Sequence, residues 1–190
     1  MRLGILGGSF DPPHVGHLLA AVDAFDGLGL DRLVFVPAAV QPLKEGLATA
    51  TADQRLAMVQ LLVGNDERFE VSATEIQRPG LSYSVDTLED FARRYPRAER
   101  FFLVGADAMT TFGAWKEPER IVRLAQLTVL RRPGAATESG PVPAGTISLT
   151  TRLIDVSSTE IRARVRTGKS IRGFVPESVA GFIEAEQLYL

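Results

Sequence analysis

The chain has 190 residues, of which 45% are hydrophobic and 23% charged, and this balance is typical of one globular domain with a sizeable core. A formal net charge of −2 argues against general affinity for nucleic acid, so any bound anion should be small. The absence of cysteine excludes disulfides and thiolate metal sites. The first apolar run is too short for a signal peptide and no run has the length of a membrane span, so we expect a cytoplasmic protein without membrane association.

Residues 3–17 read as a buried strand, a tight glycine turn and the start of a helix, and they contain both histidines of the chain. Gly7 and Gly8 lack a Cβ atom, so the backbone there can adopt positive φ and approach a phosphate closely. His14 and His17 can point in one direction, beside free N–H groups and the positive end of the helix dipole. A glycine turn and a capping histidine are each common in α/β domains, but the His-x-Gly-His spacing favours an anion site with two added donors.

Short apolar strands alternate with helical patterns along the rest of the chain, which favours a doubly wound parallel sheet. Contiguous apolar residues, as expected for strands covered on both faces, predict further strands at 32–37, 69–73, 100–104, 126–130 and 153–156. Capping-box spacings predict helix starts at Thr51 and Ser157, and Pro176 is suited to a first helical position. Residues 133–146 are rich in glycine and proline and predict a surface loop within a single domain, 1–190, whose C-terminal helical part is about 157–190.

Several polar residues follow the predicted strands, where ligands bind in open parallel sheets. Asp107 could accept a ribose hydroxyl, or it could cap a helix. Trp115 could stack on an aromatic ring, or it could anchor the core. Arg131 and Arg132 suit bidentate phosphate contact, although solvated surface positions explain them equally well. Lys44 could reach a phosphate, but a solvated lysine on a loop is the better explanation from the residues alone.

Two hydroxyl-rich segments coincide with predicted helix starts. In the segment from Ser157 to Arg162, hydroxyls, free N–H groups and an arginine one turn later predict a second anion site. In the segment from Ser82 to Thr87, helix N-capping explains Ser84 and Thr87 adequately.

Six motifs in this order resemble those of bacterial nicotinate-nucleotide adenylyltransferases, within the nucleotidyltransferase superfamily that has the (H/T)xGH motif. The motifs are Gly-Gly-Ser-Phe-Asp-Pro-Pro-His-Val-Gly-His, Ser-Tyr-Ser-Val-Asp-Thr-Leu, Phe-Leu-Val-Gly-Ala-Asp-Ala-Met, the Trp115 segment, Arg-Arg-Pro-Gly and Val-Ser-Ser-Thr-Glu-Ile-Arg. The resemblance covers nearly the whole chain and implies a Rossmann-like α/β fold with a small C-terminal helical extension. It also implies an enzyme of NAD biosynthesis that transfers the adenylyl group of ATP to nicotinate mononucleotide and releases pyrophosphate.

The resemblance assigns a role to each motif residue. His14 and His17 would be the catalytic residues at the ATP phosphates, Asp107 would face the ribose, and the Ser157 segment would hold the outer phosphates. The complete ATP site would comprise Gly7, Gly8, Ser9, Phe10, Lys44, Gly105, Asp107, Ser157, Ser158, Thr159 and Arg162. The site for nicotinate mononucleotide would comprise Tyr83, Ser84, Val85, Thr87, Trp115, Arg131 and Arg132.

One departure from the family pattern concerns the segment Gln41-Pro42-Leu43-Lys44, where leucine replaces the usual histidine. A phosphate role for this segment would therefore depend on Lys44 alone. No carboxylate cluster offers a metal cage, so we expect Mg²⁺ to be carried by the ATP phosphates.

Three alternatives remain at this point. The acceptor could be nicotinamide mononucleotide or phosphopantetheine, because the same ATP site would serve, or the protein could be a non-catalytic nucleotide-binding sensor. A fragment of a class I aminoacyl-tRNA synthetase shares the histidine motif, but this chain has neither a lysine-rich second motif nor a basic surplus. Preference for an acid over an amide would need backbone N–H donors or a cation near Trp115, and the sequence leaves open both this preference and assembly into a homo-oligomer.

Overall fold

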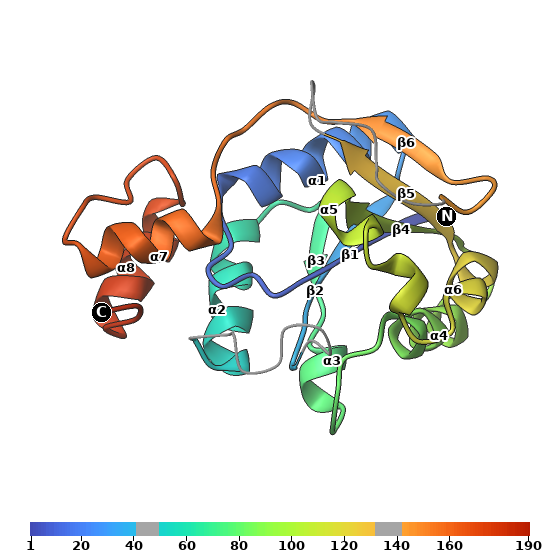
Figure 1. Ribbon diagram of the computed structural model, residues 1–190, viewed down its shortest axis with the longest axis horizontal. Helices are drawn as coiled ribbons and strands as arrows, with labels where there is room; N and C mark the ends of the chain where they lie inside the picture. The colour runs from blue at the N-terminus through green and yellow to red at the C-terminus, as the bar shows by residue number, and fades with distance from the viewer. Residues whose placement is uncertain (41–49, 132–141) are drawn as a thin grey trace.

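A six-stranded parallel sheet forms the centre of the computed structural model, which describes residues 1–40, 50–131 and 142–190 (Figure 1). Its strands are β1 (Arg2–Gly8), β2 (Arg32–Pro37), β3 (Phe69–Val71), β4 (Glu99–Gly105), β5 (Gln126–Arg131) and β6 (Ile147–Thr150). They pair in the order β3-β2-β1-β4-β5-β6, and every pair is parallel. The order reverses between β1 and β4, and in such sheets this switch point is where ligands bind. The predicted Rossmann-like doubly wound α/β fold is confirmed.

Helices cover both faces of the sheet (Figure 1). One face is packed by α1 (Val15–Leu28) and α2 (Ala52–Val63), with α7 (Ser158–Arg166) and α8 (Glu177–Ala185) adjoining them. The other is packed by α4 (Ser84–Arg94), α5 (Ala106–Met109), the 3₁₀ helix η1 (Phe112–Ala114) and α6 (Pro118–Leu124), while α3 (Thr74–Gln77) follows β3. None of the helices in the described part of the chain combines the length and apolar composition needed to cross a membrane.

The second strand shows why these apolar runs form buried parallel strands. Side chains of successive residues point to opposite faces, so Leu33 and Phe35 join the core beneath α1 and α2. Val34 and Val36 join the core beneath α4 and α6, and all four side chains are fully buried. The contiguous run therefore reflects a strand covered on both faces, as predicted.

The strand predicted at 153–156 is wrong. The last strand is β6, and its ladder ends where the Thr151 N–H donates to the carbonyl of Arg131 at 2.8 Å. The next residue, Arg152, bonds to the Asp23 carboxylate of α1 through its backbone N–H at 2.7 Å and its Nε at 2.9 Å. The chain leaves the sheet at this point, so the apolar pattern of 153–156 has no strand to pair with.

The C-terminal helices share a core with the sheet. Ile161 of α7 and Ile183 of α8 belong to the same buried cluster as Leu33. This packing supports a single domain over 1–190, which stays a prediction. Pro176 is the N-cap of α8 rather than its first helical residue, and most of the loop predicted at 133–146 lies outside the described residues.

Candidate active site

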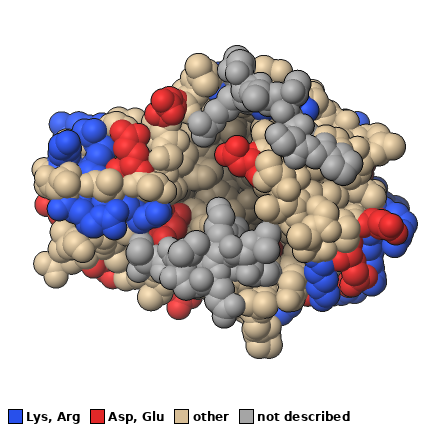
Figure 2. Space-filling model, in the orientation of Figure 1, with Lys and Arg blue, Asp and Glu red and all other residues tan. Residues whose placement is uncertain are grey.

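A cavity of about 840 Å³ lies at the carboxyl ends of β1 and β4, where the strand order reverses. Its walls come from both sides of the sheet, with α1 and the start of α7 on one side and α4, α5 and η1 on the other. Figure 2 shows this face of the molecule, which is hollowed near its centre. The shape can hold a ligand that spans the switch point.

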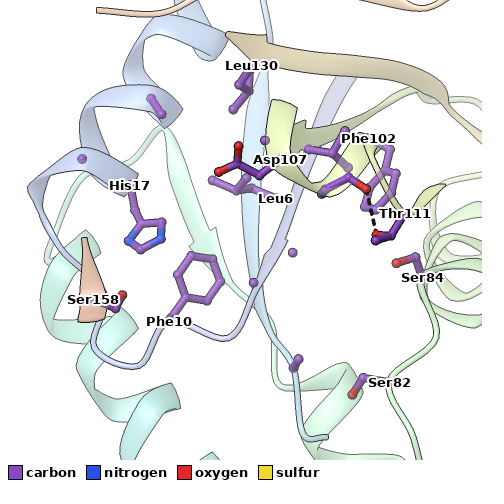
Figure 3. Close-up of a pocket in the computed structure, with 18 of the residues that line it drawn as sticks. Leu6, Phe10, His17, Ser82, Ser84, Phe102, Asp107, Thr111, Leu130 and Ser158 are labelled. Atoms are coloured by element: carbon purple, nitrogen blue, oxygen red, sulfur yellow. Dashed lines mark hydrogen bonds between the residues drawn. The ribbon is translucent and has the colours of Figure 1, made fainter. Parts of the chain in front are cut away.

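The two histidine rings pack against each other, tilted by 33°, where α1 begins. His14 is the N-cap residue and is buried, and its ring centroid lies 3.8 Å from that of His17. The backbone N–H of His14 donates to Nδ1 of His17 at 3.2 Å. Because Nδ1 accepts this bond, a neutral His17 carries its proton on Nε2 and acts as a donor there. Figure 3 shows the His17 ring beside Phe10 within the cavity.

Gly8 and Gly16 leave space for the neighbouring rings of Phe10 and His14. Gly7 and Gly8 end β1 and neither is at positive φ, so the expectation of a left-handed backbone there is wrong; the left-handed residue of this segment is Phe10, at φ 50°. The close approach of a phosphate to these glycines stays a prediction. A Cβ atom on Gly8 would lie 3.0 Å from Cζ of Phe10. A Cβ atom on Gly16 would lie 2.9 Å from Nδ1 of His14, a distance that real Cβ atoms do not adopt. The glycine of the His-x-Gly-His motif is therefore required by the position of the first histidine.

Side chains of α7 join the two predicted anion sites directly. The Ser158 hydroxyl donates to the carbonyl of Pro12 at 2.8 Å, and Nη1 of Arg162 donates to the carbonyl of Asp11 at 2.6 Å. Ser157 caps α7 as predicted, accepting from the backbone N–H three residues later at 3.2 Å. The N-termini of α1 and α7 consequently open onto the same cavity.

A buried arginine of α2 bonds to the loop between β1 and α1, residues 9–13. Arg55 of α2 donates to the carbonyls of Ser9 at 2.7 Å, Ala39 at 2.9 Å and Ala50 at 3.3 Å. Burial lowers the pKa of the Arg55 guanidinium, and the neighbouring Asp11 carboxylate opposes this change. This buried cation satisfies three carbonyls and so ties the start of the loop at Ser9 to Ala39 and Ala50.

The C-terminal tail reaches the same loop. The hydroxyl of Tyr189 donates to Oδ1 of Asp11 at 2.8 Å, and the Ala50 N–H donates to the same oxygen at 3.2 Å. Burial and the neighbouring Asp11 carboxylate raise the pKa of the Tyr189 phenol above its ordinary value, so the phenol stays protonated. Asp11 thus connects the tail, α2 and the loop before α1.

On the opposite side of the cavity, aromatic residues form a fixed wall. The Trp115 ring packs against Phe102 and Phe112, with centroid distances of 6.2 and 5.5 Å, and its Nε1 donates to the Thr111 hydroxyl at 3.3 Å. Asp107 lies in the first turn of α5, whose N-cap is a glycine, so the capping alternative for this aspartate is wrong. Both residues line the cavity.

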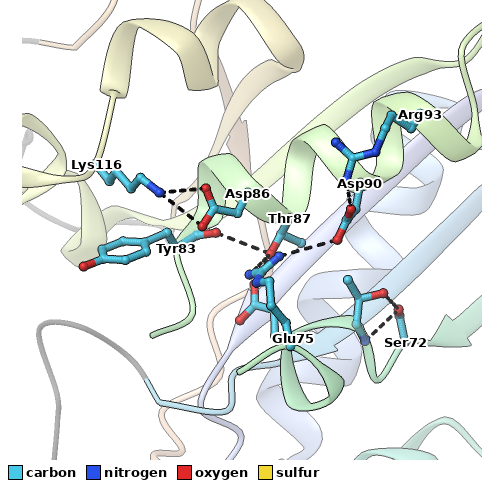
Figure 4. A network of polar contacts seen from close by, with 10 residues as sticks. Ser72, Glu75, Tyr83, Asp86, Thr87, Asp90, Arg93 and Lys116 are labelled. Atoms are coloured by element: carbon cyan, nitrogen blue, oxygen red, sulfur yellow. Dashed lines mark hydrogen bonds and ion pairs between the residues drawn. The ribbon is translucent and has the colours of Figure 1, made fainter. Parts of the chain in front are cut away.

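A buried polar network connects α3 to α4 (Figure 4). Thr87 donates to Oε1 of Glu75 at 2.6 Å and accepts from Nη2 of Arg78 at 3.1 Å. The Ala39 N–H donates to the Ser82 hydroxyl at 2.9 Å, which ties this network to the end of β2. Burial raises the pKa of the Glu75 carboxyl, and the hydroxyls of Thr87 and Ser82 oppose this effect.

N-capping was the expected role of the Ser84 and Thr87 hydroxyls, and this interpretation is wrong. The N-cap of α4 is Tyr83, and no side chain caps the helix. Ser84 is the first helical residue and lines the cavity, whereas Thr87 points into the network. The N-terminal turn of α4 therefore faces the cavity without a capping side chain.

The structure brings most of the predicted site residues together. Those lining the cavity are Gly7, Gly8, Phe10, His14, His17, Tyr83, Ser84, Gly105, Asp107, Trp115, Ser157, Ser158 and Thr159. Five others do not line it: Ser9 accepts from Arg55 through its carbonyl, Arg162 donates to the carbonyl of Asp11, Val85 is in the core, Thr87 is in the network and Arg131 ends β5. Lys44 and Arg132 lie outside the described residues.

The sequence did not predict several charged and polar residues of the site. Arg55 and Glu75 are charged yet buried, and Glu75, Ser82, Lys116 and Arg152 line the cavity. The only usable signals were the positions of Ser82 and Lys116 beside predicted site residues. Within the described residues, no group of three or more His, Cys, Asp or Glu side chains is placed to hold a metal ion.

This combination of a doubly wound parallel sheet and two helix N-termini at one cavity defines a nucleotide-binding α/β protein. The sequence model of the cytidylyltransferase-like family matches residues 5–164. A solved structure, a Plasmodium falciparum nicotinic acid mononucleotide adenylyltransferase complexed with NaAD, has the same fold. Its TM-score is 0.75 with 17% identity, covering 99% of this chain and 97% of that one.

Two relatives are similar over the whole chain, and both are described as a probable nicotinate-nucleotide adenylyltransferase. The protein of Gemmatimonas aurantiaca is 49% identical over 197 residues, covering 100% of this chain and 92% of its own. A protein of Thermus thermophilus is 47% identical over 189 residues, covering 100% of both. The chain therefore belongs to the cytidylyltransferase-like family and, within it, to the nicotinate-nucleotide adenylyltransferases.

A Cβ atom at position 16 would collide with the His14 ring, and this gives the first testable prediction. Gly16→Ala should displace the His14 ring and lower kcat/KM about 10- to 100-fold, because small shifts of a positioned group are costly in catalysis. Gly16 is the second residue of α1 and is not at positive φ, so alanine is compatible with the backbone there and the folded state should survive. The matched control is Gly181→Ala in α8, where a Cβ atom meets nothing within 4 Å. Equal activities of the two variants would contradict this account of the motif.

The buried Glu75 yields a prediction about pH. Its folded-state pKa is raised above the ordinary value of 4.5, so the folded protein loses stability as the pH rises from that value through the folded pKa. Glu75→Gln removes this titration and can still accept from Thr87. The free energy of unfolding of the variant relative to wild type, from urea titrations, should therefore increase between pH 4.5 and 7.5. The exposed Glu67→Gln is the control, and a pH-independent difference for Glu75→Gln would refute the prediction.

Proposed function

We propose that this protein transfers the adenylyl group of ATP to nicotinate mononucleotide, forming nicotinate adenine dinucleotide and pyrophosphate. The observation that carries the proposal is the convergence of two helix N-termini and the paired histidines on one cavity at the switch point. Membership of the nicotinate-nucleotide adenylyltransferases, with relatives similar over the full length, supports the same acceptor.

The triphosphate would lie between α1 and α7. Backbone N–H groups at both helix starts and the helix dipoles favour anions there. His17 would donate from Nε2, because its Nδ1 is occupied by the His14 N–H. At the other start, Nη2 of Arg162 lies 3.3 Å from the Thr159 hydroxyl and would orient it toward the outer phosphates.

The reaction would be a direct displacement. An oxygen of the mononucleotide phosphate attacks the α-phosphorus of ATP, the bond from that phosphorus to the bridging oxygen breaks, and pyrophosphate leaves. His14, His17 and the helix N-termini would stabilise the negative charge that develops on the phosphate oxygens. The site needs no covalent enzyme intermediate, because its task is to align two anions in a fixed geometry.

The remaining site residues would position the two nucleosides. Asp107, exposed at the end of β4, would accept a hydroxyl of the adenylate ribose. Trp115 would support the pyridine ring, together with Tyr83 and the first turn of α4 at Ser84. A role for Arg131 near the mononucleotide phosphate, and for Lys44 and Arg132, stays a prediction.

We propose that Mg²⁺ enters with the nucleotide. The groups that line the cavity include N–H groups, imidazoles and hydroxyls, which suit phosphate oxygens, and the carboxyl groups among the described lining residues are those of Asp107 and Glu75. Such a set fits a metal carried by the phosphates better than a cage of protein oxygens. When bound, Mg²⁺ would neutralise phosphate charge.

The choice of acceptor tests the proposed function. Pyrophosphate release from ATP should be measured with nicotinate mononucleotide, nicotinamide mononucleotide and phosphopantetheine as acceptors. We expect the highest kcat/KM with nicotinate mononucleotide. A higher value with either other acceptor would redirect the assignment, and absence of turnover with all three would favour a nucleotide-binding sensor.

The role of His17 gives a second test. His17→Ala removes a donor to the phosphates and should lower kcat by about 10²–10⁴-fold, which is typical of positioned donors in active sites. Circular dichroism and thermal unfolding should show a native fold, because the side chain lies on the cavity wall. A variant with near wild-type kcat would eliminate this role.

A further inference from the structure

A single ammonium group is held at the aromatic side of the cavity. Lys116 follows Trp115 and lines the cavity, and its Nζ lies 2.9 Å from Oδ1 and 3.2 Å from Oδ2 of Asp86. The same Nζ lies 4.7 Å from the centroid of the Tyr83 ring (Figure 4). The side chain is exposed, and the two contacts place its charge beside the first turn of α4.

The cationic groups of the cavity lie on different sides. Among the described residues that line it, the lysines and arginines are Lys116 and Arg152. Arg152 pairs with Asp23 of α1 at 2.8 Å, next to the α7 side of the cavity. Of these two cations, Lys116 is the one beside the residues expected around the pyridine ring: it follows Trp115 in sequence and contacts the Tyr83 ring.

We propose that Lys116 determines the selectivity of this site for a pyridine nucleotide with a carboxylate over one with a carboxamide. This inference rests on the proposed function. An ammonium has three N–H donors, so one that pairs with Asp86 keeps a donor for a ring carboxylate. Asp86 increases the difference between the two substrates when the lysine is removed. Its carboxylate then repels a substrate carboxylate, but it can still accept an N–H from a substrate amide.

The test is a comparison of acceptor binding and turnover. Calorimetry measures the affinity of nicotinate mononucleotide and of nicotinamide mononucleotide, and pyrophosphate release gives kcat/KM for each. Lys116→Met should weaken binding of the acid, and lower its kcat/KM, about tenfold or more, while the amide changes less than about twofold. The wild-type preference for the acid should also decrease with ionic strength, because the ammonium is exposed to solvent.

Two further variants control for charge and for folding. Lys169→Met removes the same charge at an exposed position outside the cavity and should leave both acceptors unchanged. Lys116→Arg keeps a cation beside Asp86 and should retain most of the discrimination. Thermal unfolding of each variant shows whether the fold is intact.

The outcomes separate this inference from the proposed function. If wild type binds neither mononucleotide, the proposed function fails and the inference fails with it. If wild type prefers the acid and Lys116→Met keeps that preference, or weakens both acceptors equally, the inference alone is overturned. A selective loss of the acid, with Lys169→Met unchanged, establishes it.

Discussion

The site depends on hydrogen bonds to the carbonyl groups of one short loop, residues 9–13. Two prolines and a sharp change of direction prevent this loop from pairing in a helix or strand, so other parts of the chain must satisfy its buried polar groups. Arg55 bonds to the Ser9 carbonyl from α2, while Arg162 and Ser158 of α7 bond to the carbonyls of Asp11 and Pro12. The loop is therefore held from two directions before any ligand is present.

This arrangement explains why an anion site forms here. Placing the loop fixes the N-terminus of α1 with His14 and His17, and the bonds from α7 bring a second helix N-terminus to the same cavity. Donors fixed in advance need no reorganisation when charge develops on a phosphate, which is the main advantage of a preorganised site. Arg162 serves both purposes, because one guanidinium bonds both to the loop and to the Thr159 hydroxyl.

The sequence predicted those features that neighbouring residues determine. Contiguous apolar runs predicted β1 to β5 but not β6, and the capping box at Thr51 is present because its partner, Gln54, is three residues away. The strand at 153–156 failed because an apolar pattern does not show where a ladder ends. An arginine in a helix is usually expected at the surface, yet Arg55 is buried and bonds to a carbonyl 46 residues away. The roles of the site residues remain predictions, since they depend on a ligand.

The pairing of β1 also governs the order in which the molecule can assemble. One edge of β1 is closed by β2, but the other is closed only by β4, where Arg2 meets Glu99 across a separation of 97 residues. Arg162 bonds to the loop across a separation of 151 residues. Such distant partners slow folding, and during synthesis they emerge from the ribosome last. The binding crevice should thus be among the final parts of the molecule to take shape, after the first βα units have already condensed.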